Sequence, residues 1–166
     1  MDALEALRTR RSVRTYEKRP VSKEDLETLV DCGRLAATAR NAQPWEFIVV
    51  TEDEVLRSLA KLADNGKFIA EAPACIAVFC EDSDYYLEDG CAATQNILVA
   101  ACALGLASCW VAGDRKPYAE KVCALLGAPA GYKLISLIPV GYSSEKPTPV
   151  KRPLEDVIHW EHFTGA

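Results

Sequence analysis

Two uninterrupted apolar segments constrain the fold of this chain most strongly. Residues 74–80 read ACIAVFC, and LISLI at 134–138 lies within a second segment, 133–141. A strand with one solvated face alternates apolar and polar residues, whereas a strand covered on both faces is apolar throughout. We therefore predict that both segments are strands of one sheet, with helices on both of its faces.

The other predicted elements alternate with these strands along the chain. Aromatic and β-branched residues favour further strands at 45–50 and 107–111. Apolar spacing and end signals predict helices at 2–10, 23–37, 51–63, 87–104 and 116–126. No internal repeat interrupts the series, and 166 residues suffice for one core. We expect one domain spanning 1–166, in which 153–166 form a C-terminal arm.

The predicted arm is unusually apolar for a chain end. Val157, Ile158, Trp160 and Phe163 follow the last predicted strand. Exposed apolar groups of this kind mark docking segments. The arm therefore docks either on a second subunit or on its own core, and the sequence leaves both open.

Charge and hydropathy exclude two classes of partner. The net charge of −5 provides no basic excess to neutralise a nucleic acid. Residues 90–113 carry no charge, which is compatible with a membrane span. Gln95 and Asn96, and the break around Gly105, instead favour a buried helix followed by a buried strand. We expect no membrane association.

Seven cysteines are scattered through apolar segments. None forms a C-x-x-C pair, and both histidines, His159 and His162, lie far away in the tail, so a metal site has little support. Their number is odd and no secretory signal is present at the N-terminus. We interpret them as buried thiols of a cytoplasmic protein, with a single nucleophilic cysteine as the alternative.

The segment 10–16, RRSVRTY, is the strongest candidate for chemistry. Its β-branched and aromatic residues favour an extended backbone, which would place Arg10, Ser12 and Arg14 on one face. Guanidinium groups bind phosphate or carboxylate oxygens bidentately. The alternative is a solvated end of the preceding helix, where cations are also favourable.

Familiar catalytic motifs are absent from the chain. There is no P-loop, no G-x-G-x-x-G fingerprint and no G-x-S-x-G elbow. Histidine-based catalysis is disfavoured, and the carboxylates fall where helix starts and surfaces are predicted. An anion site with few titratable groups is typical of a protein whose bound cofactor carries the chemistry.

Four motifs, in order along the chain, resemble the FMN-dependent nitroreductase family. They are RRSVR at 10–14, NAQPWEF at 41–47, ALGLASCWVAG at 103–113, and PVGY at 139–142 followed by KRPLEDVIHW at 151–160. The resemblance implies an α+β fold with a central, mainly antiparallel or mixed sheet flanked by helices. It also implies an intertwined homodimer that binds FMN at its interface.

The resemblance assigns the cofactor contacts by position. Arg10, Ser12 and Arg14, with Arg11 between them, would hold the FMN phosphate and reach the pyrimidine edge of the flavin. Lys151 and Arg152 would complete the phosphate site. The full set of implied cofactor-binding residues is Arg10, Arg11, Ser12, Arg14, Thr38, Asn41, Gln43, Ala112, Gly113, Lys151 and Arg152.

The remaining implied contacts come from two loops. Thr38, Asn41 and Gln43 would arrive from the other subunit and line the flavin ring. The backbone N–H groups of Ala112 and Gly113 would face flavin O4 and N5, since glycine permits a close backbone approach; the alternative for Gly113 is a turn after a strand.

The sequence does not decide the roles of three further residues near these loops. Arg40 is either a contact for an anionic substrate or a surface cation. Asn65 and Lys67 lie in a region where relatives contact the flavin, but their spacing does not align cleanly.

The implied activity is transfer of a hydride or electrons from NADH or NADPH through FMN to a small electron-poor acceptor, such as a nitroaromatic or a quinone. One site would serve both substrates in a ping-pong mechanism. The alternatives are a flavin-storage or redox-sensing protein without turnover, and a related flavin enzyme such as a reductive dehalogenase. Only three residues separate Gly113 from Pro117, which leaves no room for the lid that a dehalogenase would need.

Overall fold

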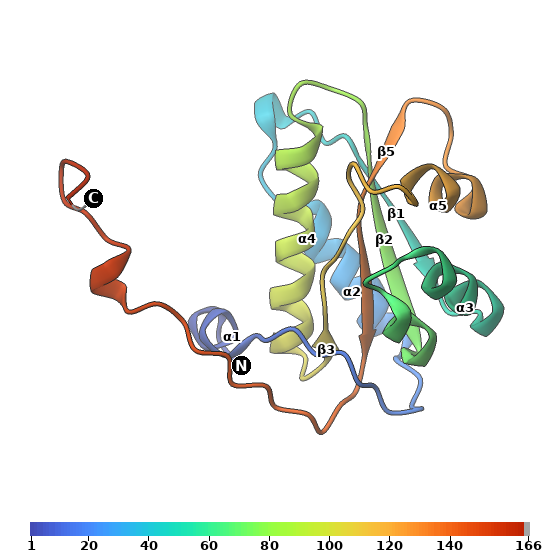
Figure 1. Cartoon of the computed structure of the whole chain (residues 1–166), viewed down its shortest axis with the longest axis horizontal. Helices are drawn as coiled ribbons and strands as arrows, with labels where there is room; N and C mark the ends of the chain where they lie inside the picture. The colour runs from blue at the N-terminus through green and yellow to red at the C-terminus, as the bar shows by residue number, and fades with distance from the viewer. Residues whose placement is uncertain (165–166) are drawn as a thin grey trace.

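The computed structural model describes residues 1–164, which are organised around one antiparallel sheet (Figure 1). Its strands are β1 (Trp45–Val50), β2 (Ala74–Glu81), β3 (Ala107–Ser108), β4 (Val111–Ala112) and β5 (Tyr132–Gly141). Their order is β1-β2-β5-β3, and β4 also pairs with β5. The predicted α+β class is confirmed, and three of the four predicted strands are present within one residue of their expected ends.

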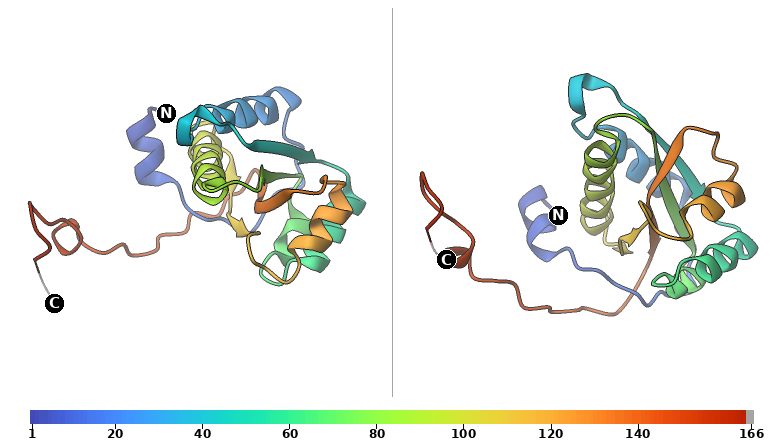
Figure 2. Two further views of the ribbon diagram at one scale, coloured as in Figure 1. Left: turned by 90° about the horizontal axis from the view of Figure 1, so that it is seen from above. Right: turned by 45° about the horizontal axis from the view of Figure 1, so that its top comes forward.

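Helices cover both faces of the sheet, as the apolar strands predicted (Figure 2). They are α1 (Ala3–Thr9), α2 (Lys23–Arg34), α3 (Asp53–Leu62), α4 (Tyr86–Ala103) and α5 (Ala119–Leu126), with short 3-10 turns at η1 (Ala39–Asn41), η2 (Lys67–Glu71) and η3 (Leu154–Asp156). α2 and α4 pack on one face, whereas α3, η2 and α5 pack on the other.

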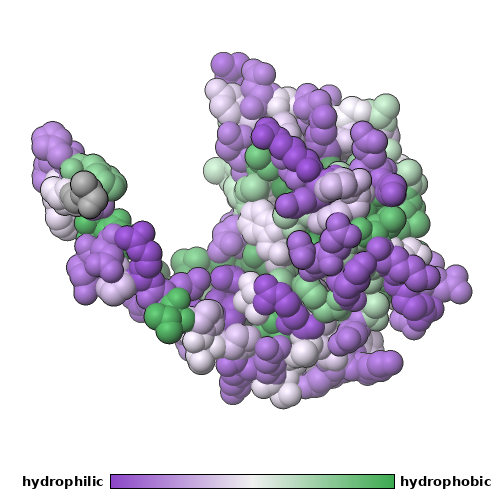
Figure 3. Space-filling model, in the orientation of Figure 1, coloured by the Kyte–Doolittle hydropathy of each residue, from purple (hydrophilic) through white to green (hydrophobic). Residues whose placement is uncertain are grey.

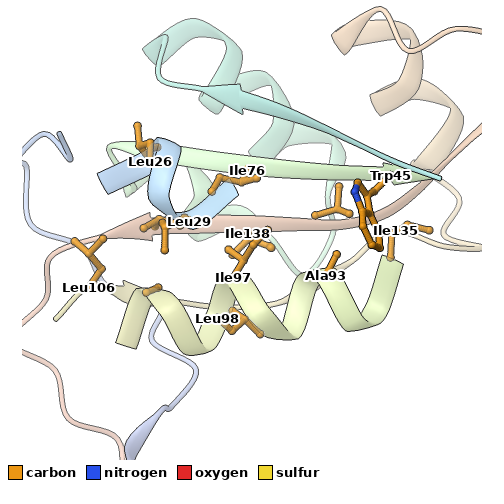
Figure 4. Close-up of a cluster of buried hydrophobic side chains, with 14 of the residues drawn as sticks. Leu26, Leu29, Trp45, Ile76, Ala93, Ile97, Leu98, Leu106, Ile135 and Ile138 are labelled. Carbon is orange, nitrogen blue, oxygen red and sulfur yellow. The ribbon is translucent and has the colours of Figure 1, made fainter. Parts of the chain in front are cut away.

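The central strand β2 shows how one segment supplies two cores. Ile76 points toward α2 and α4 (Figure 4). Val78 belongs to the same cluster, whereas Ala77 and Phe79 belong to the cluster formed with α3 and α5. Successive side chains of a strand alternate between faces, so an apolar residue is needed at every position of a doubly covered strand. On β5, the buried Ser136 is the exception, and its hydroxyl bonds to that of Thr94 on α4 at 2.8 Å.

The predicted strand 107–111 is broken into β3 and β4. The register opposes Ser108 to Val140 and Val111 to Leu137, which leaves Cys109 and Trp110 beside Ile138 and Pro139 without ladder pairing. Gly113 donates its N–H to the carbonyl of Ile135. The backbone N–H and C=O groups of the odd-numbered residues in this part of β5 therefore point toward β3 and β4. Pro139 has no N–H to donate toward that side, which accounts for the break.

Two predicted helices are shorter than expected. The helix predicted at 23–37 ends at Arg34, because its buried stripe ends at Gly33 and Leu35 is exposed. The helix predicted from 116 begins at Ala119, because a residue before proline, here Lys116 before Pro117, disfavours helical backbone. The uncharged segment 90–113 forms most of α4 and then β3 and β4, and within residues 1–164 no helix is long and apolar enough to cross a membrane.

The C-terminal arm runs past α1 and away from the sheet (Figures 1 and 3). Of the expected 153–166, residues 153–164 are described and the last two lie outside the described range. Trp160 is 73% exposed, and the other apolar side chains are also exposed: Leu154, Val157, Ile158 and Phe163. Docking of these side chains on their own core, one of the two alternatives, is therefore not what the structure shows.

The thiol interpretation is confirmed in part. All seven cysteines are free; Cys75, Cys80 and Cys109 are buried, while the other four are half-buried. Within residues 1–164 no group of three or more metal-ligating side chains is present.

Candidate functional site

The segment after α1 is extended and lies along the sheet, as predicted. Ser12 forms an isolated parallel bridge with Ser108 of β3, and Val13 donates its N–H to the Ser108 carbonyl at 3.0 Å. The Tyr16 hydroxyl donates to the carbonyl oxygens of Val13 at 2.8 Å and of Pro139 at 3.3 Å. The second of these carbonyls lies beside the break in the ladder. Val13 is buried, so its neighbours Ser12 and Arg14 take the other face.

Arg14 lies near the thiol of Cys109, and the two line the same cleft. Burial raises the pKa of Cys109, and Arg14, Ser12 and Arg10 oppose that shift. Arg10 lines a neighbouring hollow together with Arg11.

Arg11 interacts with the end of α1 through part of its guanidinium. Its Nη1 donates to the carbonyls of Arg8 and Arg10, both at 2.8 Å. These carbonyls lie at the end of α1, where backbone acceptors lack helical partners and attract a cation. Arg11 also lines the same hollow as Arg10, so this helix-end contact does not remove it from the predicted cofactor set.

A cleft of about 560 Å³ opens beside Arg14. Its walls come from the extended segment, the turn between α3 and η2, the broken strand β3–β4 and the start of α5. The lining residues are Arg14, Asp64, Asn65, Lys67, Phe68, Cys109, Trp110, Val111, Ala112, Lys116 and Tyr118. The break at Pro139 thus places Cys109 and Trp110 in a wall instead of a ladder.

Asn65 and Lys67, which the sequence left open, both line this cleft. The signal was present in the turn Asp64-Asn65-Gly66, which indicated a change of direction but not its destination. Gly66 makes the close approach: a Cβ there would lie 2.8 Å from Ala63 and 3.2 Å from Val111 on β4. The turn is therefore packed tightly against the strand that forms the opposite wall.

The cleft carries an excess of unpaired positive charge. Arg14, Lys67 and Lys116 have no carboxylate within 4.0 Å among the described residues, and Asp64 is the one acidic residue in the walls. The Arg14 guanidinium lies 5.9 Å from the centre of the Phe68 ring, a distance typical of a cation–π contact. Such a site suits an anionic or electron-rich ligand.

A larger cleft, about 770 Å³, lies between α2 and β1 but does not share this character. Its cations are paired with neighbours on α2, since Lys23 contacts Glu27 at 3.4 Å and Arg34 contacts Asp31. The remaining walls are mostly apolar, including Leu26, Val30, Phe47 and Val49. Size therefore does not identify the candidate site, whereas unpaired charge does.

The edge of β4 offers one backbone donor to the cleft. Gly113 donates its N–H to the Ile135 carbonyl at 2.9 Å, so this pair is hydrogen-bonded across the ladder. Hydrogen-bonded and non-bonded pairs alternate in an antiparallel ladder, so the N–H of Ala112 points away from β5, toward the cleft.

This geometry corrects the expectation for Gly113. Its N–H is already engaged by Ile135 and does not face the cleft with that of Ala112. Glycine is required for another reason: a Cβ at this position would lie 2.5 Å from Leu134 Cγ and 3.0 Å from the Leu134 carbonyl oxygen. The close backbone approach that glycine permits at this position is therefore to β5.

Thr38, Arg40, Asn41 and Gln43 do not line this cleft. They surround η1, which lies beside the start of α4 (Figure 1), where Ala39 donates its N–H to the buried Asp89 at 3.0 Å. The turn is held by the Gln43 N–H, which donates to Thr38 Oγ1 at 3.3 Å. Within one chain these residues and Arg14 are not brought together.

Lys151 and Arg152 are also apart from the cleft. Both are exposed just before the arm, and Arg152 Nη2 donates to the carbonyl of Asp156 at 2.5 Å. A neighbouring hollow that includes Arg10 and Arg11 is lined by the segment after β5 only as far as Thr148. The described chain therefore does not bring Arg152 against Arg10.

Comparison with known proteins places the chain in a family. The model for the nitroreductase family matches residues 7–84 and 65–142. A Methanothermobacter thermautotrophicus protein, provisionally named NADH dehydrogenase/NAD(P)H nitroreductase, is 35% identical over 172 residues, which span 98% of this chain and 88% of that protein.

Solved structures agree with that match. A Parabacteroides distasonis protein with the same provisional name superposes with a TM-score of 0.92 at 34% identity, covering 97% of this chain and 98% of its own. An FMN-dependent nitroreductase from Clostridium difficile has a TM-score of 0.90 at 28% identity, covering 96% and 99%. The four motifs, the antiparallel fold and these relatives together show that the chain belongs to the nitroreductase family.

Proposed function

We propose that this protein is an FMN-dependent oxidoreductase that takes reducing equivalents from NADH or NADPH and passes them to a small electron-poor acceptor. The observation that carries the proposal is the cleft beside β4, where unpaired cations meet a backbone donor in a member of the nitroreductase family. The names of relatives support the cofactor and the nicotinamide substrate.

The residues present fit FMN. Its phosphate requires cations and hydroxyls, which Arg10 and Ser12 supply, and its flavin accepts hydrogen bonds along the pyrimidine edge and at O4. Arg14, Asn65 and Lys67 would serve the pyrimidine edge, and the Ala112 N–H would donate at the O4–N5 side. Bound FMN supplies hydride and electron transfer, and the chain supplies position and charge.

The same cations would tune the cofactor. Positive charge beside the pyrimidine edge stabilises the anionic reduced flavin, which raises its reduction potential. This arrangement suits a ping-pong reaction, in which the nicotinamide leaves before the acceptor enters the same space.

We also propose that the active form is a homodimer. Thr38, Asn41 and Gln43 lie in or beside the η1 turn, away from the cleft of their own chain, and Lys151 and Arg152 directly precede an arm that exposes its apolar side chains. A second copy would bring the η1 loop to the flavin, place Arg40 near the substrate and cover the arm, while Lys151 and Arg152 complete the phosphate site. On the cysteine pattern of the sequence we propose a cytoplasmic location.

Two experiments test the proposal. Purified protein titrated with FMN should bind it and show a flavin absorption band, and a protein that takes up no FMN would overturn the assignment. Anaerobic mixing of the loaded protein with NADH and, separately, NADPH should bleach that band within seconds to minutes. A flavin that stays oxidised with both would favour storage or redox sensing instead of turnover, and an acceptor screen with the reduced protein would identify the second substrate class.

Oligomeric state is measured independently by sedimentation of the full chain. A dimer is expected, and removal of the aromatic groups of the arm, Trp160→Ala with Phe163→Ala, should shift it toward monomer. A monomeric wild-type protein that nevertheless binds FMN tightly would contradict the dimer.

A further inference from the structure

Tyr118 is a buried tyrosine whose hydroxyl meets the backbone of the cleft. It lies at the N-cap of α5, is 6% exposed and lines the cleft beside Ala112. Its hydroxyl donates to the carbonyl oxygen of Ala112. The family motifs quoted above do not include this residue.

The register of β4 explains why that carbonyl needs a partner. Gly113 bonds to Ile135, so the preceding residue, Ala112, belongs to a pair that is not hydrogen-bonded across the ladder. Both the N–H and the C=O of Ala112 therefore point to the outer side of β4. Without Tyr118 this edge would present a donor and an acceptor to the cleft; with Tyr118 it presents the donor alone.

Two more contacts hold the same backbone in place. The Tyr86 hydroxyl of α4 donates to Asp114 Oδ1 at 2.8 Å, just beyond Gly113. Gly113 itself is confined by Leu134. Burial and the neighbouring Asp64 raise the pKa of Tyr118, so its hydroxyl keeps the proton that it donates.

The distinction between donor and acceptor matters to a flavin. Its O4 accepts hydrogen bonds in both redox states, whereas N5 accepts when the ring is oxidised and carries an N–H when it is reduced. A backbone donor alone matches the oxidised ring, and a free carbonyl would match the N–H of the reduced ring. Hydrogen bonds to the ring nitrogens are one of the ways in which a protein sets flavin electronics.

We propose that Tyr118 is a positioning residue which occupies the Ala112 carbonyl, so that the edge of β4 offers the flavin only the Ala112 N–H. The inference rests on the proposed function, because it concerns FMN bound in this cleft. It deepens that function by assigning the balance between oxidised and reduced cofactor to a tyrosine that need not touch either substrate.

The test is Tyr118→Phe, which keeps the buried ring and removes the hydroxyl. Dissociation constants for oxidised and for reduced FMN are measured anaerobically, together with the two-electron midpoint potential of the bound cofactor. We expect affinity for oxidised FMN to fall about 10-fold relative to affinity for reduced FMN, which corresponds to a rise of about 30 mV in midpoint potential.

Two tyrosine variants provide matched controls. Tyr132→Phe removes a hydroxyl for which the described residues give no hydrogen bond, and it should change neither constant. Tyr86→Phe loosens the same backbone from the other side while leaving the Ala112 carbonyl occupied, and it should leave the ratio of the two constants unchanged. Thermal unfolding of each variant confirms that it is folded.

The outcomes separate this inference from the proposed function. Wild-type protein that binds no FMN overturns both. Wild-type protein that binds FMN, with an unchanged ratio of constants in Tyr118→Phe, overturns the inference and leaves the proposed function standing. An equal shift in Tyr86→Phe also overturns it, because the cause would then be general loosening of the backbone.

Discussion

At one edge of the sheet β1 lies beside an apolar cleft whose cations are paired on α2, and at the other edge β3 and β4 border a cleft whose cations are unpaired. β1 is regular over six residues and, among the described residues, pairs only with β2. The opposite edge is interrupted at Cys109 and Trp110. Other segments complete its backbone contacts. Ser12 forms a bridge with Ser108 of β3, and the Tyr118 hydroxyl donates to the carbonyl of Ala112.

The difference shows how an irregular edge becomes a ligand site. A regular strand directs its side chains above and below the sheet and leaves a row of backbone groups that another strand can satisfy. A broken strand, here opposite Pro139, instead directs side chains and one backbone N–H toward a cavity. These are the side chains of Cys109 and Trp110 and the N–H of Ala112. The β1 edge therefore leaves a regular row of backbone groups open, and the β3–β4 edge borders the cleft with unpaired cations.

The largest expected effect concerns the arginines assigned to the phosphate. Arg10→Ala or Arg152→Ala should each weaken FMN binding by ~1.5–3 kcal/mol, the range for hydrogen bonds to charged groups. Fluorescence titration of FMN measures this. Arg34→Ala, which removes a cation from the cleft beside β1, is the matched control and should leave FMN affinity unchanged. Unchanged affinity in both test variants would move the phosphate away from Arg10 and Arg152.

The next comparison contrasts packing at the two edges. Gly113→Ala should lower the free energy of unfolding by about 1–3 kcal/mol, because the new Cβ would press on Leu134 and on its carbonyl. Val49→Ala on the exposed side of β1 should change it by no more than about 0.5 kcal/mol, as is usual for surface sites. Urea unfolding measures both, and equal losses would remove the distinction.

A pH dependence follows from β2, which lies between β1 and β5. Burial raises the pKa of the Cys75 and Cys80 thiols from 9.0 to about 12. Above pH 9 the unfolded chain releases these protons and the folded chain keeps them, so stability is full below pH 9 and falls as the pH rises toward 12. The loss at pH 10 is on the order of 1 kcal/mol for each thiol.

Urea unfolding between pH 7 and pH 10 checks this slope. Cys75→Ala should make it shallower, after correction for the lost packing at neutral pH. A wild-type stability that is flat to pH 10 would contradict the role of burial.

The smallest effect separates Arg11 from Arg10. Arg11→Ala should destabilise the protein by about 0.3–1 kcal/mol, since its guanidinium interacts with the end of α1. FMN affinity should not change, because the Nη1 of Arg11 is engaged by the carbonyls of Arg8 and Arg10. Loss of FMN binding in this variant would show that Arg11 contacts the cofactor.

Local pattern was sufficient wherever the relevant physics is local. The uninterrupted apolar segments predicted β2 and β5 and the helices on both faces, because a doubly covered strand requires apolar residues on both sides. The β-branched and aromatic residues of 10–16 predicted the extended backbone that the structure has beside β3. Pro117 could have predicted that α5 begins after it, because the residue before a proline disfavours helical backbone.

Tertiary structure alone decided what depends on partners distant in the sequence. The break at Cys109 and Trp110 follows from the position of Cys109 opposite Pro139, and the close contact of Gly113 follows from its position beside Leu134 and Ile135. The arrival of Asn65 and Lys67 beside Arg14 depends on how the turn at Gly66 packs against Val111. Strand register and packing are long-range properties, so the sequence determined which residues could serve a cofactor, and the folded sheet decided which of them face the same cleft.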